Sequence, residues 1–263
     1  MLLSPAKSLR ADVDRQAGTC PAFRDKTTEL VKALQKLDSK QIADLMRISP
    51  PLAAMNQQRF ADWHWEAHTG LGQPAALLFD GPVYQGLDYG SLRARERQFA
   101  NRRLRILSGL YGILRPGDLI QPYRLEMGSR FRVNSQSKDL YQFWGSDLQN
   151  AISNDLPGRS AVILNLASRE YARAARLPEL QGERAPELQV IEPHFLDRSR
   201  KGEYKMMTAY AKRARGLMAR FVVSHRIQNP TDLQRFDLEG YRLDPAAGTP
   251  ASPVFKRDHP IKA

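Results

Sequence analysis

The chain has 263 residues, of which 40 are Lys or Arg and 28 are Asp or Glu, so its formal net charge at pH 7 is +12. This excess favours polyanionic partners, namely DNA, RNA or an anionic membrane surface. The single cysteine, Cys20, excludes an internal disulfide, and no apolar run reaches the roughly 18 residues that a membrane span needs.

These limits predict a soluble, cytoplasmic protein with no membrane anchor. No linker rich in Gly, Ser or Pro divides the chain, so we expect one domain over residues 1–263.

The chain begins with a short apolar strand at residues 1–3, and the turn that follows carries Ser4 and Lys7. This is the S-x-x-K pattern, in which lysine acts as the base for a serine nucleophile. The S-D-N and K-T-G motifs that complete such a site do not appear in the chain. Besides a nucleophile, two interpretations stay open: Ser4 and Lys7 hold an anion, or they belong to a simple turn.

Apolar spacing predicts a helix over residues 25–38 and two short helices over residues 39–62. We expect Ser39 to cap the first short helix and the Ser-Pro-Pro run at residues 49–51 to begin the second. This pair resembles a helix-hairpin-helix element, whose amides can bind phosphate. An ordinary helical hairpin explains the pattern equally well, and the turn at residues 109–116 is a second candidate place.

Trp63, His64 and Trp65 suggest a metal site or a stacking platform, but a second pair of ligands is missing, which favours partial burial. The five histidines are dispersed and no carboxylate pair has metal-ligand spacing. We therefore predict no metal and no cofactor. The apolar run at residues 75–79 predicts a buried strand.

Arginines dominate the middle of the chain. A helix is predicted over residues 92–108, and residues 93–132 contain ten arginines, no lysine and three acids. The planar guanidinium fork suits phosphate and carboxylate groups better than an ammonium does. A solvated basic face is the alternative explanation.

Residues 161–166 give the clearest buried strand of the sequence, and the polar residues Asn165, Ser168 and Glu170 follow at its end. Side chains at the carboxyl end of a central strand often line a ligand crevice. A cap for the following helix is the rival interpretation.

A long helix is predicted over residues 205–227, with Lys212, Arg213 and Arg220 on the face opposite its apolar stripe. Gly216 lies within that basic face, where it would let a polyanion approach closely; the alternative is that Gly216 accommodates a crossing helix. From about residue 245, Gly, Pro, Ala and Ser predict a mobile C-terminal tail.

The residues alone thus predict a mixed α+β protein of the α/β class, a single compact domain with short central strands and surrounding amphipathic helices. Nucleic-acid binding through phosphates is the leading function. The rival is an enzyme acting on a nucleotide or another phosphorylated small molecule, in a pocket of polar side chains with Glu170 as general base; its residues are Ser4, Lys7, Asn165, Ser168, Glu170 and Tyr210. A protein that only recruits partners through its helices is a third possibility.

Several segments, in order, resemble the YaaA family of bacterial peroxide stress resistance proteins. The most specific is SGLYGILRPGDLIQPYRLEMG at residues 108–128, and others are LLSPAKSL at 2–9, KDLYQFWG at 138–145 and LNLASREY at 164–171. Where the family usually has Gly-Asp-Val-Tyr, this chain has Pro82 in place of the acid.

The resemblance implies one mixed α/β domain with a helix-hairpin-helix element and a positively charged cleft. It also implies binding of duplex or distorted DNA, protection against peroxide and a low level of free iron, an effect that we expect to be indirect. By position, the cleft and its DNA contacts are carried onto the basic residues Lys7, Arg115, Arg124, Lys212, Arg213, Arg215 and Arg220.

Overall fold

The computed structural model describes residues 1–11, 17–65, 72–156, 158 and 160–258. A central sheet is formed by β1 (Leu2–Leu3), β5 (Arg105–Ser108) and β6 (Gly112–Leu114), in the order β1-β5-β6. β1 runs parallel to β5, and β5 runs antiparallel to β6. All but Arg105 among these strand residues are buried, which is why such short apolar segments form strands.

On its other side β1 meets the end of β8 (Ala161–Leu164), which pairs in parallel with β9 (Leu188–Ile191). A parallel bridge joins Leu2 to Asn165, and the Leu166 N–H donates to the Leu2 carbonyl at 3.0 Å. The predicted strands at residues 1–3 and 161–166 are therefore confirmed. Their carboxyl ends lie at the same edge of the sheet.

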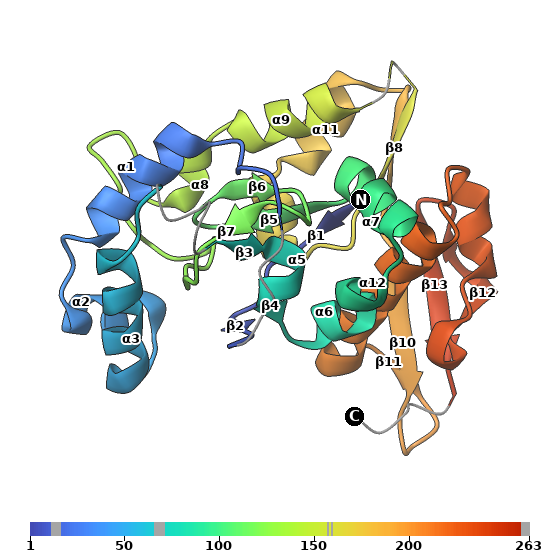
Figure 1. The fold of residues 1–263 in the computed structure, drawn as a ribbon. Helices are drawn as coiled ribbons and strands as arrows, with labels where there is room; N and C mark the ends of the chain where they lie inside the picture. The colour runs from blue at the N-terminus through green and yellow to red at the C-terminus, as the bar shows by residue number, and fades with distance from the viewer. Residues whose placement is uncertain (12–16, 66–71, 157, 159, 259–263) are drawn as a thin grey trace.

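A second sheet lies beside the first, to the right in Figure 1. Its order is β11-β10-β13-β12, with bounds β10 (His194–Arg198), β11 (Tyr204–Lys205), β12 (Arg242–Thr249) and β13 (Ser252–Arg257). The mobile tail predicted from about residue 245 is wrong as far as residue 257, because that segment forms the β12–β13 hairpin. Residues 259–263 lie outside the described part of the chain.

A buried charged pair holds the β12–β13 hairpin against β10. The Arg257 Nε lies 2.7 Å from the Asp197 carboxylate, and the Tyr241 hydroxyl donates to the same carboxylate at 3.0 Å. Because Ser, Pro and Gly residues lie in and beside β13, the sequence pattern indicates a loop there, and the strand was not predicted.

Two small strand pairs complete the β structure: β2 (Ser8–Leu9) with β4 (Phe79–Asp80), and β3 (Gln73–Pro74) with β7 (Leu119–Ile120). The strand predicted over residues 75–79 is wrong, since α5 (Ala75–Leu78) is a single helical turn. It is buried on all sides, so its apolar run carries no periodicity that separates helix from strand.

The first helices are α1 (Arg24–Leu34), α2 (Ser39–Met46) and α3 (Pro50–Ala61), which form the left side of the molecule in Figure 1. They match the predicted segments. The cap of α2 is Asp38, whose carboxylate accepts from the Gln41 N–H at 2.8 Å, rather than Ser39.

The remaining helices cover the two sheets. They are α6 (Pro82–Leu87), α7 (Ala94–Arg103), α8 (Leu140–Trp144), α9 (Asp147–Asp155), α10 (Arg169–Ala174), α11 (Leu177–Glu183) and α12 (Thr208–Ser224), with short 3-10 turns at Tyr89–Ser91, Pro230–Arg235 and Leu238–Gly240. One continuous hydrophobic core joins the elements, so the mixed α/β single domain is confirmed.

The helix predicted over residues 92–108 is too long. α7 ends at Arg103, and residues 105–108 leave the helix to form β5 between β1 and β6. The Arg105 N–H donates to the Met1 carbonyl at 2.9 Å. Pairing on both sides of β5 thus overrides a helical spacing of apolar residues that continues past Arg103.

α6 and α12 cross at two glycines. A Cβ at Gly216 would lie 1.8 Å from the Val83 carbonyl oxygen, and one at Gly86 would lie 2.4 Å from the Arg213 carbonyl oxygen. Gly216 is buried by this crossing. It therefore accommodates a helix, and the interpretation that it opens a basic face to a polyanion is wrong.

We predict that Gly216→Ala lowers the free energy of unfolding by about 3 kcal/mol or more, because the backbone of α6 must move to admit the methyl group. Thermal unfolding measures this. The matched control is Gly182→Ala in α11, where a Cβ meets nothing within 4 Å and a helical Gly is replaced by a better helix former. Equal melting temperatures for the two variants would contradict the tight crossing.

Candidate functional site

Polar residues gather where β1 and β8 end. The Ser168 N–H donates to the Ser4 Oγ at 2.8 Å, and the Ser4 hydroxyl donates to the Ser168 Oγ at 3.2 Å. Because the two strands are parallel neighbours, residues 164 positions apart meet here. We name the group Ser4, Lys7, Arg124, Glu126, Asn165, Ser168 and Glu170 the carboxyl-end site.

Glu126 joins the two basic members of the carboxyl-end site. Its carboxylate lies 2.6 Å from the Lys7 Nζ and 3.1 Å from the Arg124 Nη2. Lys7 keeps 60% of its side chain exposed, whereas Arg124 keeps 20%. Within the described residues, the buried Nε of Arg124 has no hydrogen-bond partner. The site therefore holds two cations around one carboxylate, and the Arg124 Nε–H remains as a donor without a partner in the described part of the chain.

Glu170 stabilises the turn that carries Glu126. Its carboxylate accepts from the Gly128 N–H at 2.7 Å, and the neighbouring Tyr171 hydroxyl accepts from the Met127 N–H at 3.4 Å. These two hydrogen bonds hold residues 126–128 against the start of α10. The structure gives Glu170 a positioning contact where the sequence suggested a general base.

Asn165 is buried and serves the backbone. Its Oδ1 accepts from the Ala167 N–H at 3.1 Å, and its Nδ2 donates to Glu192 at 3.3 Å. These contacts support the strand-end cap. Tyr210, also proposed for the pocket, lies elsewhere. The centre of its ring is 5.0 Å from the guanidinium carbon of Arg257, a residue of the second sheet.

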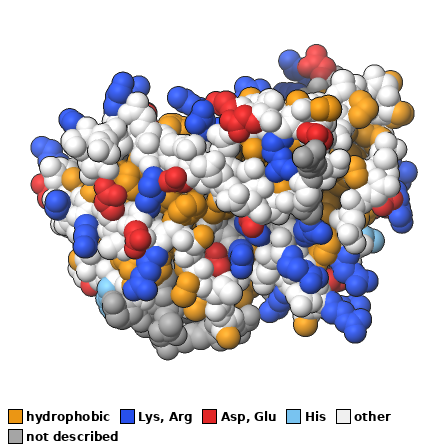
Figure 2. Space-filling model, turned by 90° about the horizontal axis from the view of Figure 1, so that it is seen from above, with side chains coloured by type: hydrophobic (Ala, Val, Ile, Leu, Met, Phe, Trp, Pro, Cys, Tyr) orange, Lys and Arg blue, Asp and Glu red, His pale blue; other side chains and the backbone are white. Residues whose placement is uncertain are grey.

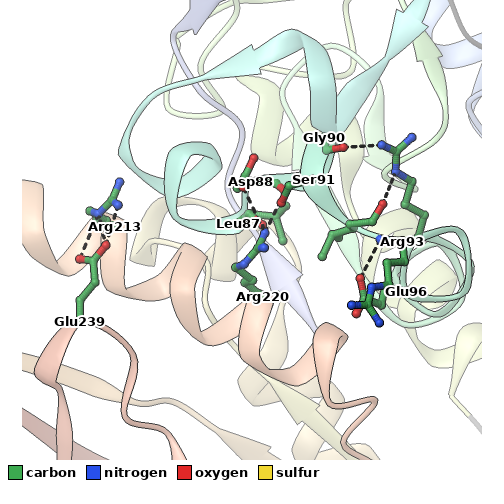
Figure 3. A network of polar contacts seen from close by, with 11 residues as sticks. Leu87, Asp88, Gly90, Ser91, Arg93, Glu96, Arg213, Arg220 and Glu239 are labelled. Carbon is green, nitrogen blue, oxygen red and sulfur yellow. Dashed lines mark hydrogen bonds and ion pairs between the residues drawn. The ribbon is translucent and has the colours of Figure 1, made fainter.

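Two of the arginines predicted to contact DNA are held within the protein (Figure 3). Arg213 forms a two-pronged ion pair with Glu239, with contacts of 2.5 and 2.8 Å, and this hydrogen bonding raises the pKa of Arg213. The Arg220 Nη1 donates to the carbonyls of Leu87 and Asp88 at 3.1 and 3.0 Å. Arg220 therefore caps the last turn of α6.

The other predicted DNA contacts do not form one surface. Arg215 is half-buried, and burial lowers its pKa while Glu192 acts in the opposite direction. Arg115 is exposed and follows β6, which runs antiparallel to β5 from Gly112 opposite Ser108 to Leu114 opposite Ile106, and so leads toward the amino end of β5. It thus lies at the opposite end of the central sheet from Lys7. Lys212 is exposed and has no acidic partner within the described ranges.

The distribution of surface charge agrees with the finding that the predicted DNA contacts do not form one surface. On the face shown in Figure 2, Lys and Arg side chains are spread widely, with Asp and Glu side chains among them. The net charge of the chain therefore does not by itself define a groove.

The turn between α2 and α3 offers few amide donors. Arg47 adopts a left-handed conformation with φ of 52°, which turns the chain toward α3. Pro50 and Pro51 occupy the first two helical positions and carry no N–H. Of the first three residues of α3, only Leu52 can donate to a phosphate, so this helix N-terminus is a poor anion site.

In the Trp63–Trp65 segment, Trp63 is packed into the core, whereas His64 is exposed and Trp65 is partly buried. The Trp63 indole donates to the Tyr111 hydroxyl at 2.9 Å and Trp63 is buried, in agreement with the burial favoured from the sequence. No group of three or more His, Cys, Asp or Glu side chains with metal-ligand geometry is found among the residues that the structure covers.

Three buried tyrosines lie beneath the carboxyl-end site. The Tyr84 hydroxyl donates to the Ser4 carbonyl at 2.9 Å, and the Tyr123 hydroxyl contacts the Ser108 Oγ at 2.6 Å. Burial raises the pKa of Tyr84, Tyr123 and Tyr171, and the pKa values of Tyr84 and Tyr171 are raised further by Tyr123. Glu126 was not predicted as a site residue, although its spacing of two from Arg124 in an extended segment places both on one side.

The fold is thus a mixed α/β domain whose polar side chains gather at strand ends, and it can be compared with known proteins. A family model described as peroxide stress protein YaaA matches residues 1–247. The chain is 47% identical to UPF0246 proteins of Ralstonia pickettii and Burkholderia multivorans, over 261 and 262 residues, and 46% identical to one of Dechloromonas aromatica over 260 residues. Each alignment covers 98% of both chains.

The chain therefore belongs to the peroxide stress protein YaaA family, as its motifs predicted. This membership supports a role in peroxide stress. In the described part of the protein, no helix is long and apolar enough to cross a bilayer.

We predict that stability falls as pH rises above about 10, because ionising a phenol that is buried only in the folded state costs free energy there. Each fully buried tyrosine contributes up to about 1.4 kcal/mol per pH unit. Urea unfolding between pH 8 and pH 11 measures the slope, and Tyr123→Phe should make it shallower. Tyr210→Phe, at a half-buried position, is the control, and identical slopes in all three proteins would contradict the prediction.

Proposed function

We propose that this protein acts in the peroxide stress response by binding duplex or distorted DNA through its phosphates, on the side of the molecule that carries the carboxyl-end site. One observation supports this above others. Four cations are exposed on four separate segments, namely Lys7, Arg130, Arg169 and Lys212, and we infer from the chain connections that they lie around that side. Only Lys7 has an acidic partner among the described residues.

Chain connections support the grouping. Glu126 binds Lys7, and the Gly128 N–H binds Glu170, which brings Arg130 and Arg169 toward the same strand ends. Lys212 belongs to α12, which packs against α6. The residue before α6, Gly81, lies close to the segment that carries Lys7, because a Cβ at Gly81 would lie 3.8 Å from the Ala6 Cβ. Cations on phosphates confer affinity with little sequence preference, as expected for a protein that shields damaged DNA of any sequence.

We predict that Arg169→Ala with Lys212→Ala weakens binding to a 20-base-pair duplex and makes the plot of log affinity against log salt shallower by about 0.9 for each lost contact. Fluorescence anisotropy between 50 and 200 mM salt, on a matched duplex and one with a central bubble, measures both. The charge-matched control is Arg95→Ala with Arg115→Ala, two exposed arginines that are not among these four cations. No binding at low salt, or equal slopes for both double variants, would overturn the proposal.

The convergence of Ser4, Lys7, Arg124 and Glu126 favours a second candidate, an enzyme acting on a nucleotide or another phosphorylated small molecule. In this function, Lys7 and Arg124 hold the phosphate and the Ser4 hydroxyl orients it. The Glu126 carboxylate occupies the position between the two cations where a phosphate oxygen would bind.

We predict from this candidate that Glu126→Gln tightens the binding of adenosine 5′-monophosphate about tenfold, since a competing charge is removed, and that Arg124→Gln abolishes it. Isothermal titration calorimetry measures both, with neutral adenosine as the control ligand. If neither variant changes the affinity for the monophosphate, the small-molecule function fails while the DNA proposal is untouched.

A further inference from the structure

A cleft of about 580 Å³ lies at the opposite end of the central sheet from the carboxyl-end site. Residues from β1, α7, α9, β8, β9 and α12 line it, together with the segment that follows α12. Its volume falls within the roughly 300–1,000 Å³ that is typical of small-molecule sites. Neither the peroxide stress family nor the proposed DNA contact assigns it a role.

One wall of the cleft is an uncovered strand face. Val162 lies in the middle of β8, paired with Gln189 of β9, yet it is 41% exposed. Its neighbours Ala161 and Ile163 point to the opposite, buried face. Parallel strands normally have both faces covered, so the apolar surface at Val162 lacks the cover that a helix would provide.

Apolar side chains from distant parts of the chain also line the cleft. They are Leu2, Phe99, Val222 and Leu233, from β1, α7, α12 and the 3-10 turn at residues 230–235. All four are otherwise buried. A hydrocarbon or aromatic group placed on Val162 would therefore contact apolar surface on several sides and lose little hydration of polar groups.

The charges at the cleft are asymmetric. Arg102 and Arg103 end α7 at the rim, are exposed, and have no acidic partner within the described residues. Arg105 is already paired with Asp155 at 2.6 Å, and Glu187 lies exposed among the lining residues. Cations at a helix C-terminus also favour the helix dipole, but that interaction leaves their N–H groups free for a ligand.

We propose that this cleft binds an amphiphilic organic anion, whose apolar body lies on Val162 and whose carboxylate is held by Arg102 and Arg103. A charged guanidinium pair fits one carboxylate head, and the apolar wall fits an alkyl or aryl body rather than a polar nucleotide. The site is separate from the DNA-binding side, so either proposal can fail without the other.

The test uses the full chain and the fluorescent probe 8-anilinonaphthalene-1-sulfonate, displaced by decanoate. We expect decanoate to displace the probe, and acetate and decanol to do so at least about tenfold less well, since each lacks one half of the recognition. Arg102→Ala with Arg103→Ala should weaken decanoate about tenfold or more. Arg93→Ala with Arg95→Ala, at the start of the same helix and outside the cleft, is the matched control and should leave the affinity for decanoate unchanged.

Val162→Glu gives an independent check, since it places a like charge on the apolar wall at a position exposed enough to keep the fold, as thermal unfolding verifies. It should abolish displacement by decanoate. The proposal is overturned if decanoate fails to displace the probe from the wild type, if it acts no better than decanol, or if the Arg102/Arg103 and Val162 variants bind decanoate as the wild type does.

Discussion

The arrangement of the domain depends on the backbone pairing of the two-residue strand β1. Leu2 and Leu3 pair with β5 on one side, and Leu2 bridges to Asn165 on the other. Segments more than 100 residues apart are thereby brought into one sheet, and both of its ends become sites for polar residues. Without this strand, Ser4 would not reach Ser168 and the cleft would lack the lining residues Met1 and Leu2.

The sequence predicted those parts of the fold in which local pattern and final burial agree. The buried strand at residues 161–166 and the amphipathic helices before residue 62 are such cases. It failed where long-range pairing decides: residues 105–108 continue a helical spacing but join a sheet, and residues 252–257 resemble a loop but form a strand between two others. No periodicity within a segment reports which distant strand will pair with it.

The arginines show the same limit for the site. Counting charges along residues 93–132 and 200–226 identifies where cations are concentrated, but their function depends on the acids that the fold places beside them. Arg213 meets Glu239 and Arg220 meets the end of α6, whereas Arg169 and Lys212 stay unpaired in the described part of the protein. Ser4, Lys7 and Ser168 could be grouped from the sequence because each lies within four residues after a strand. Glu126 could not, since its strand-like segment has no regular neighbour.

The pairing of Asp197 with Arg257 has a consequence for how the second sheet forms. Both side chains are nearly inaccessible to solvent, so a sheet with β10 in place but β13 absent would bury a carboxylate without its counter-charge. Such an intermediate is strongly disfavoured, by several kcal/mol. Strands β10, β12 and β13 should therefore open and close as one cooperative unit, with backbone amides in all three exchanging their hydrogens at similar rates.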